Sequence, residues 1–355
     1  MARRSKPAPP PPPLPDPEPP RKRGRWGLYA PFVLALVVVA AWSGLWVYAR
    51  QEAAAQLDAA AADLRQAGYE LSWSERRIGG YPFRLNLTLT EARVRESSGW
   101  ALAAPRIEAQ AFLHGLGTWV IAAPEGLTFV RPVGGAVAVQ GETLRASLSQ
   151  MSRRPPNISF QGINLAFVPA AGAQPFALSA AEKVEFHLRA GPDDQAMLGF
   201  RVDQGQARLS GLFARVADGG PVSIVWDSIL SKVSAFSGES WPAAVRAWSA
   251  AGGVAEVRQA GVTAGEAVIG SQSGRLTVGY DGRLRGVLDV SLREAPRALA
   301  AMGDEGVIPK DAAAAAAAVA AARQEAGPLA RATLNFEAGR TTLGPVAVGP
   351  APRIY

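Results

Sequence analysis

Cysteine is absent from this sequence of 355 residues, and histidine occurs only twice. The absence of cysteine excludes disulfide bonds, thiolate zinc sites and a cysteine nucleophile. Both histidines have simple structural interpretations, because His187 falls on the polar side of an alternating strand pattern and His114 falls in a turn. We therefore expect no metal ion or other cofactor.

The motifs of common hydrolases and nucleotide-binding enzymes are also missing. The chain contains no HExxH zinc motif, no GxSxG nucleophile elbow and no GxxxxGKS or GxxxxGKT phosphate loop. Two carboxylate pairs, Asp193 with Asp194 and Asp304 with Glu305, lie in glycine-flanked loops, where solvated charges are typical. The sequence thus predicts a protein that is not an enzyme, with a carboxylate-based envelope hydrolase as the less favoured alternative.

Positive charge is abundant overall but scarce outside the N-terminus. The formal net charge is +7, and residues 1–25 hold seven basic and two acidic residues, which leaves a net charge of only +2 for the rest. The same 25 residues are rich in proline, so we expect a disordered cytoplasmic tail without helix or sheet. A basic cluster beside a membrane is explained by contact with anionic lipids. Nucleic acid is therefore not an expected partner.

A long uncharged run follows the basic tail. The twenty residues 28–47 carry no charge, and as a helix they would span the roughly 30 Å hydrocarbon core of a bilayer. We predict one transmembrane helix over residues 26–48, with aromatic residues near both ends of the apolar run. The anchor residues are Trp26, Leu28, Phe32, Trp42, Trp46 and Tyr48.

The excess of lysine and arginine before this run predicts a cytoplasmic N-terminus. Residues from about 49 onward would then face the other side of the membrane. A cleaved signal peptide is the alternative, since Ala53 and Ala55 are small enough for a peptidase site. The apolar run is longer than a usual signal core, which favours retention of the anchor.

After the anchor, an alanine-rich segment over 49–68 predicts a helical stalk that ends at Gly68. From residue 69 onward, alternating apolar and polar residues separated by glycine predict many short strands. The predicted fold class is α+β, mostly β, with a few packing helices. The β-rich domain covers 69–355, and the order of its elements suggests two halves, 69–216 and 217–355.

Particular elements can be assigned within this domain. The sequence predicts helices over 222–233, from Pro242 to Gly252, over 294–302 and over 311–324. The pair Asp281 and Gly282 predicts a tight turn in a hairpin over 275–292. A last β stretch is expected over 332–336 and 342–348.

The segment Gly79, Gly80, Tyr81, Pro82 and Phe83 predicts a tight structural turn at the start of a strand. Together with its surroundings, YELSWSERRIGGYPFRLNLTLTEARV, and with WALAAPRIEAQAF and TTLGPVAVGPAPRIY, it resembles a proteobacterial domain-of-unknown-function family. That resemblance implies a β-rich, periplasm-facing protein anchored in the bacterial inner membrane, and it implies no catalytic residue. More distantly, GRLTVGYDGRLRGVLDVSL is similar to AsmA-type envelope proteins, whose curved antiparallel sheets offer an apolar groove to lipids.

These observations favour a non-enzymatic, inner-membrane-anchored periplasmic protein. Its curved sheet would bind a lipid or another amphiphile for maintenance of the envelope. The alternative is a scaffold that docks other envelope proteins, with the sheet filled by its own helices. Membrane lipids are the expected partners in the first hypothesis, and envelope proteins are the expected partners in the second.

Overall fold

The computed structural model describes residues 26–207, 220–265, 267–293, 330–344 and 346–355, with isolated residues between 304 and 321. The expected tail over 1–25 and helix over 294–302 lie outside the described residues, as does most of the expected helix over 311–324.

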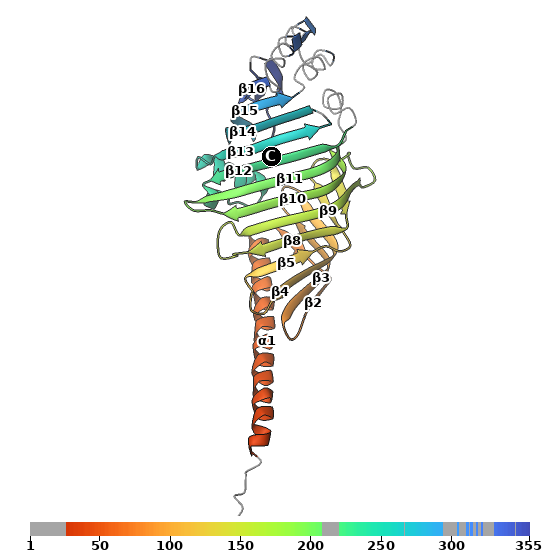
Figure 1. Cartoon of the computed structure of the whole chain (residues 1–355), viewed down its shortest axis with the longest axis vertical. Helices are drawn as coiled ribbons and strands as arrows, with labels where there is room; N and C mark the ends of the chain where they lie inside the picture. The colour runs from red at the N-terminus through yellow and green to blue at the C-terminus, as the bar shows by residue number, and fades with distance from the viewer. Residues whose placement is uncertain are drawn as a thin grey trace, which may run out of the picture.

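The predicted transmembrane helix and stalk form one uninterrupted helix, α1 (Trp26–Gln66). Glycine ends it as expected, because Gly68 adopts a φ of 85° and lets Tyr69 N donate to Leu64 O at 3.0 Å. The apolar first half has exposed side chains around its circumference, while Trp46, Ala49 and Ala61 are buried. The C-terminal half of α1 therefore packs on the rest of the protein, and the N-terminal half stands clear of it (Figure 1).

Within the residues that the structure describes, the chain after α1 is built around one antiparallel sheet of eighteen strands. The first nine strands are β1 (Glu70–Ser72), β2 (Glu75–Gly79), β3 (Arg84–Arg95), β4 (Ala101–Phe112), β5 (Thr118–Ala122), β6 (Leu127–Arg131), β7 (Gly135–Gln140), β8 (Thr143–Ser149) and β9 (Asn157–Pro169). The remaining strands are β10 (Leu178–Ala190), β11 (Gln195–Ala207), β12 (Val222–Ser231), β13 (Ala255–Ala264), β14 (Ala267–Val278), β15 (Leu284–Arg293), β16 (Ala330–Glu337), β17 (Arg340–Leu343) and β18 (Val346–Pro350). The mostly β fold class is confirmed.

The sheet divides once and then continues as a simple meander. The long strand β4 pairs with β5 along one part and with β6 along another. Two strand pairs, β5 with β8 and β6 with β7, then run side by side, and β7 and β8 each pair with a different part of β9. From β9 to β18, each strand pairs with the next. The connection between the two expected halves of the domain lies between β11 and β12, which pair with each other. Figure 1 shows the strands stacked along the long axis of the molecule, curving around it, with α1 at one end.

The prediction of a helix over residues 222–233 is wrong, because Val222–Ser231 is the strand β12. Apolar residues at spacings of three and four produced the helical pattern. Val225 and Ile229 are apolar but lie on the opposite face of the sheet from Trp226, whereas the polar Ser228 lies on the same face as Trp226. The alternation of apolar and polar residues that is typical of a strand is therefore not visible in the sequence. Four of its ten residues are valine or isoleucine, and β-branched side chains favour strands. A 3-10 helix, η1 (Val233–Ala235), follows this strand.

The helix expected to begin near Pro242 is confirmed as α3 (Trp241–Ala250). Ser240 caps it, since its side chain accepts a hydrogen bond from Ala243 N, and Pro242 occupies the first turn, where no N–H is needed. The hairpin predicted over 275–292 is also confirmed by β14 and β15. The last β stretch forms three strands rather than two, because a turn separates β17 from β18.

Candidate functional site

One face of the sheet carries an unbroken row of mostly apolar side chains. Each member of this central row pairs directly across the ladder with the next member, from β2 to β16. In order along the sheet they are Ile78, Leu87, Ala109, Ile121, Ala146, Phe160, Phe186, Phe200, Trp226, Ala260, Ser271, Val290 and Ala332. At about 4.8 Å per strand, twelve steps give a row roughly 60 Å long before curvature.

Two flanking rows widen the central row on the same side of the sheet, because residues two apart on a strand share a face. The first consists of Trp119, Leu148, Ile158, Leu188, Leu198, Ser228, Val257, Gly274, Leu288, Leu334 and Leu343. The second consists of Leu144, Gly162, Val184, Val202, Ile224, Val262 and Ile269. We call the three rows together the apolar face.

Helices cover the apolar face at particular places along its length. The C-terminal half of α1 packs on it near β2 to β5, where Trp46 and Leu85 are buried together. On the same side of the sheet, α3 packs beside the first flanking row, where Val245 and Trp248 are buried with Val278 of β14. Between them, the four aromatic residues of the central row are only half-buried, although each has strand neighbours on both sides. A complete second layer would bury them, so this middle stretch stays accessible.

The opposite face, which we call the polar face, has a different character. One register row on it reads Arg145, Gln161, Glu185, Arg201, Val225, Gly261, Gly270, Ser291 and Arg331. Lys183 Nζ lies 2.8 Å from Glu185 Oε1, and this hydrogen bond lowers the pKa of Glu185 although burial opposes the shift; the nearby cations Lys183 and Arg201 lower it further. Charges of both signs pair on this face, as on an ordinary solvated surface.

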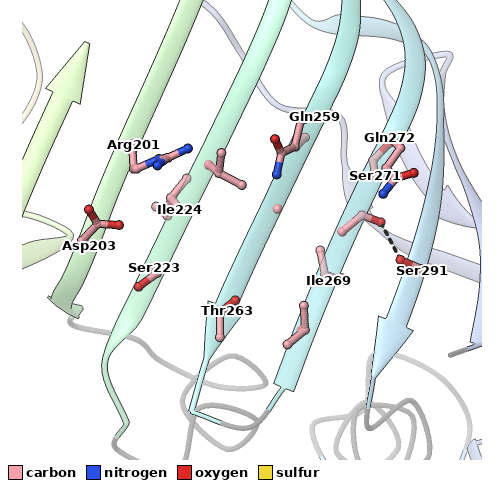
Figure 2. A pocket seen from close by; sticks show the side chains of 15 residues that line it. Arg201, Asp203, Ser223, Ile224, Gln259, Thr263, Ile269, Ser271, Gln272 and Ser291 are labelled. Atoms are coloured by element: carbon pink, nitrogen blue, oxygen red, sulfur yellow. Dashed lines mark hydrogen bonds between the residues drawn. The ribbon is translucent and has the colours of Figure 1, made fainter. Parts of the chain in front are cut away.

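The polar face contains an open hollow of about 400 Å³ across β11 to β15 (Figure 2). It arises because Gly261 and Gly270 pair across β13 and β14 and carry no side chains. Arg201 and Asp203 line one side, and Figure 2 shows Ser291 on the other, where its hydroxyl donates to Gly270 O at 3.2 Å. The side chains lie flat along the strands, and this arrangement has neither a paired acid and base nor a nucleophile.

A second cavity, of about 690 Å³, lies where α1 meets the start of the apolar face. Ala49 and Ala53 of α1 form one wall, and Leu116, Trp119 and Met151 contribute apolar surface opposite. Trp119 is also the first member of a flanking row. The cavity therefore connects the helix, just beyond its apolar run, with the apolar face.

The residues assigned to the anchor divide into two groups. Four of them are open to the surroundings, with exposed fractions of 84% for Trp26, 65% for Leu28, 71% for Phe32 and 64% for Tyr48. Trp42 and Trp46 instead contact the GGYPF turn. Trp42 Nε1 donates to Pro82 O at 2.8 Å and Trp46 Nε1 donates to Arg84 O at 2.9 Å. The predicted anchor and the predicted turn are therefore in direct contact in the structure.

The aromatic residues of the turn complete this contact. Tyr81 packs edge-on against Trp46 at 5.5 Å between ring centroids, and Phe83 lies 6.2 Å from Trp42. The Tyr81 hydroxyl and Ser43 Oγ are 2.9 Å apart. We call the contact of Trp42 and Trp46 with residues 80–84 the joint. The sequence did not predict it, because its partners are about forty residues apart and a position at a membrane interface already explained the tryptophans.

Asp194, His114 and His187, which the sequence offered as catalytic candidates, each have a separate structural setting. Asp194 accepts from Ser234 N at 2.8 Å and from its hydroxyl at 2.9 Å, which fixes the start of η1. His114 stacks on Phe112, and His187 lies on the polar face. Glu305 lies outside the described residues. Within the part of the chain that the structure describes, no three His, Asp or Glu side chains are grouped as metal ligands would be.

Comparison with protein families gives one match, to a family described as an uncharacterized protein conserved in bacteria, over residues 46–352. The chain belongs to this family, DUF2125. Neither the curated proteins nor the solved structures gave a match. The matched region begins at Trp46 and so includes that tryptophan, the turn and the apolar face of this DUF2125 chain, whereas Trp42 lies just before it.

The two glycines of the DUF2125 turn offer a matched test of its geometry. Gly80 has a φ of 99°, and a Cβ there would lie 2.7 Å from Arg84 O, whereas a Cβ at Gly79 would meet nothing within 4 Å. We expect Gly80→Ala to destabilise the turn by about 1–3 kcal/mol and Gly79→Ala to leave it intact. Limited proteolysis near residue 81 measures the difference, and equal protection of both variants would contradict this account.

Proposed function

We propose that this protein is a non-enzymatic, inner-membrane-anchored periplasmic protein whose apolar face holds the acyl chains of a phospholipid or another amphiphile. The observation that carries the proposal is the three-row apolar face, about 60 Å long, whose central aromatic residues are only half-buried. A large apolar surface of this kind costs free energy in water and marks an interaction site.

The position of the anchor supports a lipid as the ligand. One helix of the described chain, α1, has the length and composition to cross a membrane. Its basic N-terminal flank supports a cytoplasmic tail and a periplasmic sheet. The cavity between α1 and Trp119 gives an acyl chain from the outer leaflet a short path to the apolar face.

A photo-crosslinker at neighbouring positions of one strand tests the proposal. Phe186 belongs to the apolar face and His187 to the polar face, so p-benzoylphenylalanine at these two positions samples opposite sides of β10. Irradiation of the full-length protein in its native membrane should give phospholipid adducts at Phe186 and none at His187, as read by mass spectrometry.

Two other outcomes count against lipid binding. Adducts to another protein at Phe186 would favour the scaffold interpretation, in which a partner covers the apolar face. Lipid adducts of equal yield at both positions would mean contact with bulk membrane rather than a bound ligand. Native mass spectrometry of the detergent-extracted protein provides an independent check, since a lipid carrier should leave with lipid-mass adducts.

A further inference from the structure

The tip of the β2–β3 hairpin displays large aromatic side chains beside α1. Tyr81 is 53% exposed and Phe83 is 66% exposed, and Phe112, at the neighbouring end of β4, is 50% exposed. We call residues 80–84 together with Phe112 the aromatic tip. Surface aromatics on a soluble domain are normally scattered, so three of them gathered beside the membrane helix need a partner.

The height of the aromatic tip along α1 identifies that partner. Trp42 and Trp46 hold the tip through hydrogen bonds to Pro82 O and Arg84 O. Trp42 lies five residues before Val47, the end of the twenty-residue apolar run 28–47, which corresponds to about 7–8 Å along the helix. Once α1 crosses a bilayer, Phe83, whose ring lies 6.2 Å from that of Trp42, therefore lies among the outermost acyl-chain segments, just below the headgroups.

The backbone of the tip is prepared for an environment with little water. Four carbonyl oxygens there already accept hydrogen bonds: Gly80 O from Arg84 N at 3.0 Å, Phe83 O from Leu113 N at 3.0 Å, and Pro82 O and Arg84 O from the two indoles. Unsatisfied backbone groups are costly in a membrane, so each of these four pairings lowers the free-energy cost of insertion.

The side chains of the tip match the lipid–water interface as well. Tyrosine and tryptophan concentrate at that level because each ring has an apolar body and a polar group. The Arg84 guanidinium lies 5.1 Å from the centroid of Phe112, so a long, flexible cation that can extend toward lipid phosphates accompanies the exposed rings. Aromatic rings with an adjacent cation fit a phospholipid surface better than they fit bulk water.

We propose that the aromatic tip inserts into the outer interface of the membrane and is a second attachment of the sheet beside α1. The two attachments together fix the tilt and rotation of the sheet relative to the membrane, and they direct the cavity at Trp119 toward the outer leaflet. This inference rests on the proposed membrane anchoring by α1, and it does not depend on lipid binding by the apolar face.

Single cysteines carrying an environment-sensitive fluorophore test the insertion, and the natural absence of cysteine makes the labelling specific. The label is placed at Phe83→Cys, with Phe112→Cys as a second site in the tip. Val37→Cys, 58% exposed within the uncharged run, is the membrane control, and Tyr280→Cys, 87% exposed in the β14–β15 turn, is the water control. The full-length protein is reconstituted in phosphatidylethanolamine and phosphatidylglycerol vesicles.

The expected result is quenching of the Phe83 label by lipids with a spin label near the headgroup, and protection from aqueous iodide several-fold greater than at Tyr280. Iodide quenching of Phe83 equal to that of Tyr280, with Val37 quenched by lipid, would overturn the insertion and leave the anchor in place. Protection of Phe83 from both quenchers would also overturn it, since a protein would then cover the tip. A Val37 label reached by iodide would refute the anchor itself.

Discussion

Aspartate in place of Phe200 should abolish the co-purification of lipid with this protein while the sheet remains folded. Phe200 lies in the middle of the central row, between Phe186 and Trp226 on the neighbouring strands. A carboxylate at this point would have to give up its hydration to lie against an acyl chain, which costs several kcal/mol. Because each 1.4 kcal/mol is about a tenfold change in affinity, bound lipid should fall below detection by native mass spectrometry.

Val225→Asp is the matched control for this substitution. Val225 lies on the polar face, where it pairs with Arg201 on one side and with Gly261 on the other. A carboxylate there stays in water beside a cation, so lipid retention should be unchanged. Circular dichroism of both variants reports whether the sheet is intact, and Phe200→Ser provides a neutral replacement if the aspartate variant fails to fold. Equal lipid retention in Phe200→Ser, Val225→Asp and the natural protein would contradict the assignment of the apolar face.

Replacement of Trp46 by alanine should separate the hairpin from α1. Trp46 is 9% exposed, packs with Ala49 and Leu85, donates to Arg84 O and meets the edge of Tyr81. Loss of a buried tryptophan typically costs about 3–5 kcal/mol, and here the cost falls on one joint. We expect faster proteolysis of residues 79–84 and a mobile label at Phe83, measured by fluorescence anisotropy.

Trp26→Ala is the control for the joint, because Trp26 is 84% exposed and lies at the opposite end of the apolar run. It removes the same side chain from the same helix without touching the hairpin. Proteolysis of residues 79–84 should then match that of the natural protein. If Trp46→Ala behaved like Trp26→Ala, the joint would contribute little to the attachment of the sheet.

The elements that the sequence predicts well are those specified by local chemistry. Twenty uncharged residues and an alanine-rich continuation determine α1, and Pro242 and the Asp281–Gly282 pair determine α3 and the β14–β15 turn. The strand β12 was missed because its alternation is broken by Ser228. Trp226 Nε1 donates to the Ser228 hydroxyl at 3.0 Å, so the structure satisfies this polar residue by a contact that periodicity does not reveal.

The candidate site was less accessible to sequence reasoning, because register determines it. Each strand supplies only one residue to a row, and the pairing of Phe160 with Phe186 and of Phe186 with Phe200 depends on how far neighbouring strands slide. A shift by one residue would turn the aromatic side chains to the polar face. The hypothesis of a lipid-binding sheet came from the predicted fold class and the family resemblance. The position of the apolar face on the sheet could be determined only from the observed strand pairing.

From β9 to β16 each strand pairs with the next one in the chain, so the length of the sheet depends on the number of strands. Each strand contacts mainly its two neighbours, so adding or removing one hairpin between them leaves the other pairs unchanged. Because the stack runs along the long axis away from α1 (Figure 1), each hairpin lengthens or shortens the molecule by about 10 Å. The number of strands therefore sets how far the sheet extends from the end of α1.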